Sequence, residues 1–133
     1  MNLKESDKTC RESLKKERCC VVIPTYNNAS LIKPVLNGVL GYCDDVIVVD
    51  DGCTDHTPDL LVRFDQIHVV KHHQNRGKGH ALKSGFRKAR ELGFEYAITL
   101  DSDGQHAPGD IPLFLEILGQ GDPCLVVGSR KLD

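Results

Sequence analysis

The 133-residue sequence contains no tryptophan and a single methionine, and aromatic residues make up only 5% of it. A surface that binds single-stranded nucleic acid by stacking needs exposed aromatic rings, so we expect no nucleic-acid partner. An excess of one charge is also missing, because 17 Lys and Arg residues stand against 19 Asp and Glu residues, and the net charge is -2. The chain therefore has no overall field to attract nucleic acid or an anionic membrane.

Long apolar runs are absent too. No run approaches the roughly 20 residues of a membrane-spanning helix, so we expect no transmembrane segment in this chain. The first 18 residues lack the apolar stretch of a secretory signal. Six cysteines could form disulfides in a secreted domain, but without a signal we favour reduced thiols and a cytoplasmic location. No pair of CxxC motifs is present, so a structural zinc site is not expected.

What the sequence does contain is one domain of alternating strands and helices. Residues 1–18 are polar and are predicted to form an N-terminal tail or a short exposed helix, and residues 19–133 form the domain. Short apolar runs rich in Val, Ile and Leu predict strands at 19–24, 45–52, 66–72, 95–101 and 124–129. Helical spacing of apolar residues predicts helices at 29–43, 54–64, 77–93 and 111–121.

Continuous apolar strands that alternate with helices are typical of a parallel sheet covered on both faces. The fold class is therefore α/β, a mostly parallel Rossmann-like sheet. Within the predicted helix at 29–43 we place Pro34 in the first turn, with Asn28 or Ser30 as the cap. In the predicted helix at 77–93 we expect Leu92 on the apolar face and Gly93 as the stop.

Ligands of such sheets bind beyond the carboxyl ends of the strands. The four loops that follow the first four strands, PTYNN, DDGCTD, NRGKG and DSDGQH, are the most polar and glycine-rich parts of the sequence. The third is neither a P-loop nor a dinucleotide fingerprint. Its glycines and Lys78 favour an anion at the start of the next helix, and a simple glycine-rich turn is the alternative.

Asp101 and Asp103 end the fourth predicted strand. Their carboxylates are expected to converge, and like charges at close range call for a cation. Oxygen ligands suit Mg²⁺ or Mn²⁺. The alternative is a loop whose carboxylates cap the helix that begins near Asp110.

Asp50 and Asp51 end the second strand. Both cannot be buried comfortably, so we expect one to hold the turn and the other to accept from a nucleobase or ribose. Asp55 is expected to cap the next helix. The histidines show no metal-ligand spacing, and we expect His72 and His73 to be ordinary surface residues.

Taken together, VVIPTYNN, VIVVDDGCTD, NRGKGHALKSGF, LDSDGQHAP and VVGSR resemble the successive motifs of family 2 glycosyltransferases with the GT-A fold. The likeness is greatest to the polyprenyl-phosphate (dolichol-phosphate) mannosyl- and glucosyltransferases and runs from about residue 19 to 130. It implies a donor that is a UDP- or GDP-linked sugar and an acceptor such as a polyprenyl phosphate.

For the nucleotide, the resemblance implies that Pro24 and Tyr26 embrace the base and that Asp51 reads it. Asn28 stands where relatives often carry Glu. Lys78 would add positive charge beside the departing diphosphate.

For the metal, the resemblance implies that Asp101 and Asp103 bind a divalent ion and the sugar diphosphate and so carry the catalysis. Gln105 would be a further ligand, and Arg130 would face the acceptor phosphate. Cys53 stands where Ser is commoner, with little effect expected.

Family members continue well beyond the GSR motif, so this chain resembles their donor-binding half, apparently truncated. We expect it to self-associate or to be marginally stable, and to have little transferase activity alone. The whole protein would act in the cytoplasm, at the inner face of a membrane. The alternatives are a non-catalytic nucleotide-sugar-binding remnant, a nucleotidyltransferase and a signalling receiver domain.

Overall fold

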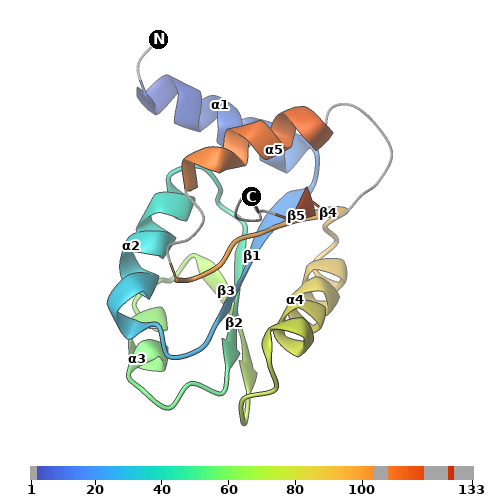
Figure 1. The fold of residues 1–133 in the computed structure, drawn as a ribbon. Coiled ribbons are helices and arrows are strands. Elements are labelled where there is room, and N and C mark those ends of the chain that lie inside the picture. Colours follow the sequence, from blue (N-terminus) through green and yellow to red (C-terminus); the bar gives the residue numbers. More distant parts are fainter. Residues whose placement is uncertain (1–2, 104–107, 119–125, 128–133) are drawn as a thin grey trace, which may run out of the picture.

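A parallel sheet runs through the centre of the molecule in the computed structural model, which describes residues 3–103, 108–118 and 126–127 (Figure 1). Its strand order is β3-β2-β1-β4-β5, and neighbouring strands pair in parallel throughout. The predicted strands are confirmed, with bounds β1 (Cys19–Thr25), β2 (Val46–Asp51), β3 (Ile67–His72), β4 (Tyr96–Thr99) and β5 (Val126–Val127).

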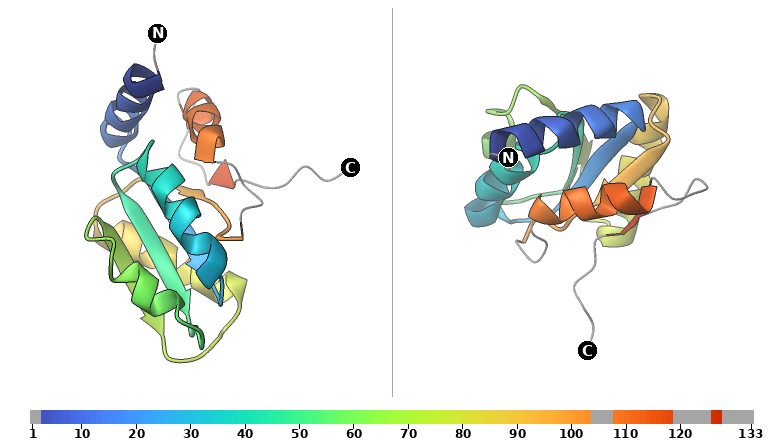
Figure 2. Two further views of the ribbon diagram at one scale, coloured as in Figure 1. Left: turned by 90° about the vertical axis from the view of Figure 1, so that its left-hand side faces the viewer. Right: turned by 90° about the horizontal axis from the view of Figure 1, so that it is seen from above.

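Both faces of the sheet are buried along β1 and β2, as the continuous apolar runs predicted, whereas most side chains of the edge strand β3 are partly or fully exposed. Side chains along β1 alternate between two clusters, so Val21 and Ile23 belong to one core and Cys20 and Val22 to the other. The first core lies under α1 (Leu3–Lys16), α2 (Ala29–Leu40), α3 (Thr57–Leu61) and α5 (Ile111–Leu118), and the second under α4 (Lys78–Glu91) (Figures 1 and 2). A short 3-10 turn, Pro108–Asp110, leads into α5.

The N-terminal segment is a helix with one buried face rather than an exposed tail. Cys10 and Leu14, one turn apart on α1, are buried in the first core, and α1 lies beside α5 (Figure 2). Arg11 and Lys15 form ion pairs with Asp44 at the start of β2. The charge-rich sequence suggested exposure because Cys10 and Leu14 stand among polar and charged residues.

Two predictions about the helices were wrong. Pro34 lies inside α2, beyond its first turn. The hydrogen bond that Pro34 cannot donate would go to the carbonyl of Ser30, which is exposed, so water can satisfy that oxygen. Leu92 is 40% exposed, because it is the C-cap residue of α4, while Ala81, Gly85 and Ala89 form the buried stripe.

Gly93 does stop α4 as predicted. It has φ 89° and donates to the carbonyl of Arg90, while the next amide, that of Phe94, donates to Ala89, each over 3.0 Å. This pair of bonds is the Schellman pattern, which favours glycine at the left-handed position. The abrupt stop lets the chain return at once into β4.

The strand order places a topological switch point between β1 and β4. From β1 the chain moves outward to β2 and β3, then returns through α4 to the opposite side of β1. The loops after β1 and β4 therefore diverge and leave a crevice at the carboxyl edge, where ligands bind in sheets of this kind. Within the residues described above, no helix has both the length and the apolar character to cross a membrane.

Candidate functional site

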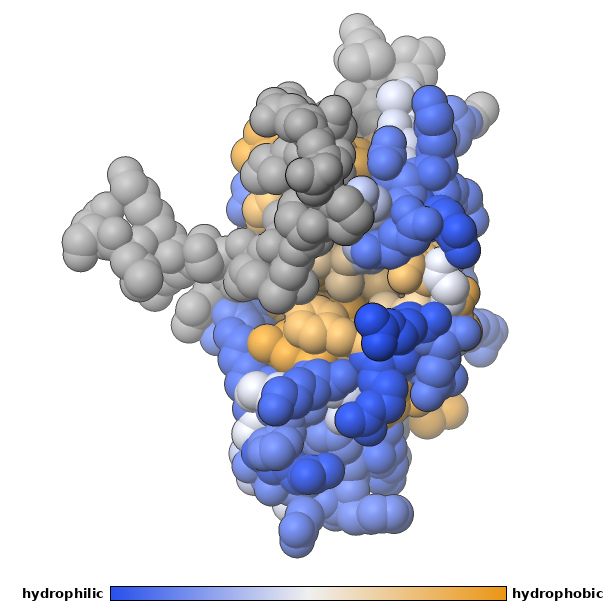
Figure 3. All heavy atoms as spheres, turned by 90° about the vertical axis from the view of Figure 1, so that its right-hand side faces the viewer, coloured by the Kyte–Doolittle hydropathy of each residue, from blue (hydrophilic) through white to orange (hydrophobic). Residues whose placement is uncertain are grey.

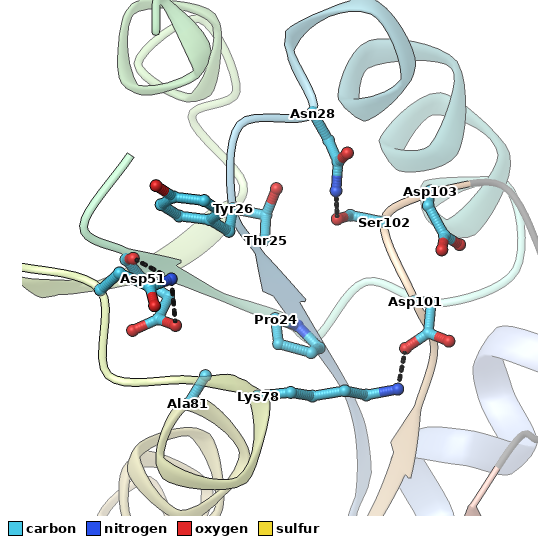
Figure 4. Close-up of a pocket in the computed structure, with 11 residues that line it drawn as sticks. Pro24, Thr25, Tyr26, Asn28, Asp51, Lys78, Ala81, Asp101, Ser102 and Asp103 are labelled. Carbon is cyan, nitrogen blue, oxygen red and sulfur yellow. Dashed lines mark hydrogen bonds and ion pairs between the residues drawn. The ribbon is translucent and has the colours of Figure 1, made fainter. Parts of the chain in front are cut away.

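A cleft of about 430 Å³ opens at this switch point (Figure 4). Its volume lies within the range of small-molecule sites. All four polar loops predicted from the sequence contribute to its surroundings. The cleft is lined by Pro24, Thr25, Tyr26, Asn28, Asp51, Asn75, Lys78, Ala81, Asp101, Ser102 and Asp103.

The predicted site residues thus come together. Figure 4 shows Asp51 on one side of the cleft and Asp101 and Asp103 on the other, with Pro24 between them. Lys78 reaches across toward Asp101. Gln105 and Arg130, predicted for the metal and for the acceptor phosphate, lie outside the described residues.

Asp51 is the most heavily bonded side chain of the cleft. One carboxylate oxygen accepts from the amide of Arg76 over 2.9 Å and lies 2.7 Å from His72 Nδ1. The other oxygen accepts from the amide of Gly77 over 2.9 Å and from Asn75 Nδ2 over 3.1 Å. Four such bonds fill about four acceptor positions of a carboxylate.

Burial alone would raise the pKa of Asp51, since it penalises the charged form. The hydrogen bonds from the His72 ring and from the amides of Arg76 and Gly77 outweigh that effect and hold the pKa below its ordinary value. Asp51 is therefore an ionised acceptor, so His72 Nδ1 carries the shared proton.

The expectation that Asp50 and Asp51 could not both be buried was wrong. Both are almost inaccessible, and both end a strand whose successive side chains point to opposite faces. The side chain of Asp50 lies on the face of the sheet that α2 and α3 cover. Its carboxylate accepts there from the amide of Cys53 over 2.9 Å. Each charge thus has its own donors, and the sheet separates them.

His72 is not a surface residue as predicted. It is 8% exposed, and its Nε2 lies 2.7 Å from the hydroxyl of Ser84 on α4. His72 is paired with Asp51 in the register of β2 and β3, so the two side chains share a face. The predicted strand bounds did not fix this register, which the structure supplies.

The loop after β1 is joined to the loop after β2 by Asn27, which the sequence analysis missed. Asn27 has φ 51°, a conformation that Asn tolerates better than most residues. Its carboxamide oxygen accepts from the amides of Thr54 and Asp55, and its nitrogen donates to the Thr54 hydroxyl. The Cys53 thiol also joins the two loops, since it accepts from the Asn27 amide and donates to the Thr25 carbonyl.

The N-cap residue of α3 is His56 rather than Asp55, but the Asp55 side chain bonds to backbone amides at two helix starts. Its carboxylate accepts from the amide of Thr57 at the start of α3 over 2.9 Å and from that of Ala29 at the start of α2 over 3.3 Å. Burial alone would raise the pKa of Asp55, but the hydrogen bonds from the amides of Thr57 and Ala29 help to lower it below its ordinary value.

Asn28 precedes α2, but its side chain does not cap the helix. Its Nδ2 donates instead to the hydroxyl of the buried Ser102 over 2.6 Å. This bond ties the loop after β1 to the loop after β4 across the mouth of the crevice. Asn28 also lines the cleft.

Asp101 and Asp103 lie in a turn just beyond the end of β4. Asp101 is 19% exposed, and its carboxylate forms an ion pair of 2.6 Å with Lys78 Nζ. A cation held there by the chain itself shows that this carboxylate is open to a positive group from within the cleft.

The donor set suits a hard divalent ion. The described residues contain no group of three or more His, Cys, Asp or Glu side chains that could hold a metal alone. Two carboxylates with room for water and for the phosphates of a substrate are the arrangement that Mg²⁺ often adopts in nucleotide sites. The residues present therefore fit a metal that arrives with a diphosphate.

Comparison with known proteins agrees with this geometry. The model of the family described as Glycosyl transferase family 2 matches residues 20–133. The chain is 35% identical over 127 residues to a UDP-N-acetylglucosamine--dolichyl-phosphate N-acetylglucosaminyltransferase of Methanococcus voltae, which covers 83% of this chain and 51% of that protein. It is 33% identical over 121 residues to the polyprenol monophosphomannose synthase of Mycolicibacterium smegmatis, covering 86% and 45% of the two chains.

Among solved structures, the chain resembles a glucosyl-3-phosphoglycerate synthase from Mycobacterium tuberculosis crystallised with Mn²⁺, UDP and glucosyl-3-phosphoglycerate. The TM-score is 0.66 at 22% identity, and the match covers 87% of this chain and 44% of that one. This likeness confirms the Rossmann-like GT-A fold. The chain spans about half the length of the curated relatives it matches.

The family match does not favour the nucleotidyltransferase or the receiver domain. It covers the whole described sheet and all four loops around the cleft. The motifs identified from the sequence, the strand order and the relatives agree, and the chain belongs to glycosyl transferase family 2.

Proposed function

We propose that this chain is the donor-binding part of a glycosyltransferase that moves a sugar from a nucleotide diphosphate to a polyprenyl phosphate with the help of a divalent metal. The observation that carries the proposal is the cleft at the switch point, in which Asp51 lies on the side opposite the Asp101 and Asp103 pair. The acceptor class follows from the relatives, whose names include dolichyl, undecaprenyl and polyprenol phosphates.

The nucleoside would lie along the loop after β1. Pro24 and the exposed ring of Tyr26 offer apolar surface, and Asp51 forms the polar end of the same wall. The diphosphate would lie between Lys78, at the start of α4, and the Asp101 and Asp103 turn. A helix N-terminus and a lysine both favour an anion.

A divalent metal, when bound, would neutralise charge on the departing diphosphate. Asp101 and Asp103 would hold it, and Gln105 is proposed as a further ligand. Mn²⁺ accompanies UDP in the structural relative, whereas for this chain Mg²⁺ and Mn²⁺ are both compatible with oxygen ligands.

In the reaction, the bond between the anomeric carbon and the diphosphate oxygen breaks, and its electron pair stays with that oxygen. An acceptor phosphate oxygen attacks the anomeric carbon from the opposite face, which inverts the configuration. This oxygen is already a nucleophile, so the step needs no general base. Lys78 would stabilise the leaving diphosphate, and Arg130 would hold the acceptor phosphate.

The acceptor would also place the protein. A polyprenyl phosphate lies in a membrane, so the whole protein would work at a membrane surface on the cytoplasmic side.

β5 lies at one edge of the described sheet, and Figure 3, which looks onto the side of α4, shows a band of apolar residues between hydrophilic areas. These features support self-association of the 133-residue chain, which light scattering over a concentration series would measure.

Calorimetric titration tests the proposal directly. UDP, GDP and their sugar conjugates are titrated into the chain with Mn²⁺, with Mg²⁺ and with a chelator. We expect one nucleotide to bind, and to bind more tightly with metal. Absence of binding under all conditions would contradict the proposed function. A donor-consumption assay with a polyprenyl phosphate then separates an active transferase from a domain that only binds the donor.

A further inference from the structure

A buried histidine lies behind the cleft and takes no part in the reaction proposed above. His72 contacts a carboxylate through one ring nitrogen and a hydroxyl through the other, both over 2.7 Å. An ionisable ring is rarely buried unless such partners satisfy it. Of its two partners, only Asp51 lines the cleft.

We propose that Ser84, His72 and Asp51 form a positioning chain that fixes the segment Asn75–Gly77, and with it Asn75 and Lys78, in the geometry that binds the donor nucleotide. The inference rests on the proposed function for the identity of the ligand. It assigns His72 and Ser84, which do not line the cleft in the described part of the chain, a role in nucleotide affinity.

Asp51 binds all three residues of the segment. The carboxylate accepts from two consecutive amides, those of Arg76 and Gly77, and from the side chain of Asn75. Gly77 has φ 98° and is directly followed by Lys78, the first residue of α4. The direction in which the chain delivers Lys78 to the cleft is therefore set by the bonds to this one carboxylate.

Close packing leaves the segment little freedom at its first residues. Gly52 has φ 72°, and a Cβ at this position would overlap the backbone of Gln74 and Asn75. The turn after β2 and the loop before α4 are thus in backbone contact directly beside Asp51.

His72 fixes the carboxylate itself. Four donors surround Asp51, and three of them belong to the loop before α4. The ring of His72 is the donor that comes from the sheet, at the register position beside Asp51. It therefore selects the orientation in which both oxygens face the loop.

Ser84 connects His72 to α4, the helix that follows the loop. In the neutral ring Nδ1 donates to Asp51, so Nε2 accepts from the Ser84 hydroxyl. The neighbouring Gly85 lets α4 approach β1, because a Cβ there would overlap Val22. The close approach brings Ser84 within reach of His72.

The affinity for the nucleotide depends on whether the loop is ordered before the nucleotide binds. If the loop is already fixed, the nucleotide meets Asn75 and Lys78 in place, whereas a loose loop must be ordered by the binding event itself. Loss of His72 should therefore weaken nucleotide binding without removing any group that contacts the nucleotide.

A matched pair of variants tests this. Asn and Leu have similar size, but an Asn amide can donate from a position near that of His72 Nδ1 and a Leu methyl cannot. We expect H72L to bind UDP or GDP about tenfold or more weakly than the wild type, since a hydrogen bond to a buried carboxylate is lost, and H72N to recover most of the affinity. S84A, which keeps the bond to Asp51, should lose less than H72L.

Amide hydrogen exchange supplies a second readout without ligand. The amides of Arg76 and Gly77 should exchange at least about tenfold faster in H72L than in H72N. The amide of Leu100, which bonds to Val22 in the sheet, reports global unfolding in the same sample.

The outcomes separate the two proposals. If the wild type binds no nucleotide, the proposed function fails, and the exchange data alone still test the positioning chain. If the wild type binds and H72L matches it in affinity, or the Arg76 and Gly77 amides stay protected, the positioning role is wrong. Equal acceleration at Leu100 would also overturn it, because the effect would then be global.

Discussion

The two ends of the cleft are built from different kinds of interaction. At one end Asp51 is nearly inaccessible and accepts four hydrogen bonds from the chain. At the other end the pair between Asp101 and Lys78 holds a lysine whose side chain is 61% exposed. Buried, fully satisfied networks are rigid, whereas exposed ion pairs contribute little and exchange readily. The difference indicates a rigid end at Asp51 and an adjustable end at Asp101 and Asp103, which under the proposed function would hold the nucleoside and the diphosphate respectively.

The largest effect should come from breaking the backbone contact at the rigid end. Gly52→Ala puts a Cβ at a positive φ and into the backbone of Gln74 and Asn75. We expect the free energy of unfolding to fall by roughly 2–5 kcal/mol, as strain and overpacking combine. Urea denaturation measures it. Gly79→Ala is the control, because its Cβ would meet open space. A Gly52 variant as stable as that control would contradict the close packing.

A smaller effect should follow from changing the charge of the rigid end. Asp51→Asn keeps the shape but replaces one acceptor oxygen with a donor, which cannot accept from the amide of Arg76 or Gly77. We expect nucleotide affinity to fall by about 1.5–3 kcal/mol, both with metal and with chelator. Calorimetry checks this. An unchanged affinity in a folded variant would mean that Asp51 serves the turn alone.

At the adjustable end, Asp103→Ala should act only through the metal. We expect nucleotide affinity measured with Mn²⁺ to fall about tenfold, toward the value measured in chelator, because one of the two proposed carboxylate ligands is lost. The affinity in chelator itself should hardly change. Equal losses in both conditions would show that Asp103 contacts the nucleotide rather than a metal.

Acid should reduce the contribution that Asp51, at the rigid end, makes to the free energy of unfolding. Hydrogen bonds lower the pKa of Asp51 in the folded state, so this carboxylate binds a proton more readily when unfolded. Its contribution to stability is present above the ordinary Asp pKa of about 4 and is lost as the pH falls through the lower folded value. The stability gap between wild type and Asp51→Asn should therefore narrow on acidification. Urea titrations between neutral and acid pH measure the gap, and a constant gap would contradict the assignment.

The sheet and the position of the cleft could be predicted because they depend on local patterns. Apolar runs of four to seven residues alternate with segments whose apolar residues have helical spacing. This pattern left few alternatives to a covered parallel sheet. The rule that ligands bind at the carboxyl ends of strands then selected the loops that carry Asp51, Lys78 and Asp101. These predictions required no knowledge of which side chains touch.

Contacts between distant residues could not be predicted in the same way. His72 is 21 positions from Asp51 and 12 from Ser84, and only the register of β2 and β3 and the close approach of α4 bring the three together. The burial of α1 was missed for a similar reason, since Cys10 and Leu14 mark its inner face only when a core exists to receive them. Such pairings are set by tertiary packing, which local propensity does not encode.

The smallest predicted effect is that of replacing Lys78, which should strengthen the binding of Mn²⁺ and weaken the binding of the nucleotide. Lys78 competes with any other cation for an oxygen of Asp101, so Lys78→Gln should bind Mn²⁺ alone about two- to fivefold more tightly, the size expected for an exposed ion pair. The same variant should bind the nucleotide in chelator more weakly, because a positive charge beside the diphosphate is lost. Electron paramagnetic resonance counts free Mn²⁺, and calorimetry follows the nucleotide. Lys83→Gln removes the same charge from an exposed position of α4 and is the control. If both variants shift Mn²⁺ binding equally, the effect comes from net charge, and Lys78 does not compete with Mn²⁺ for Asp101.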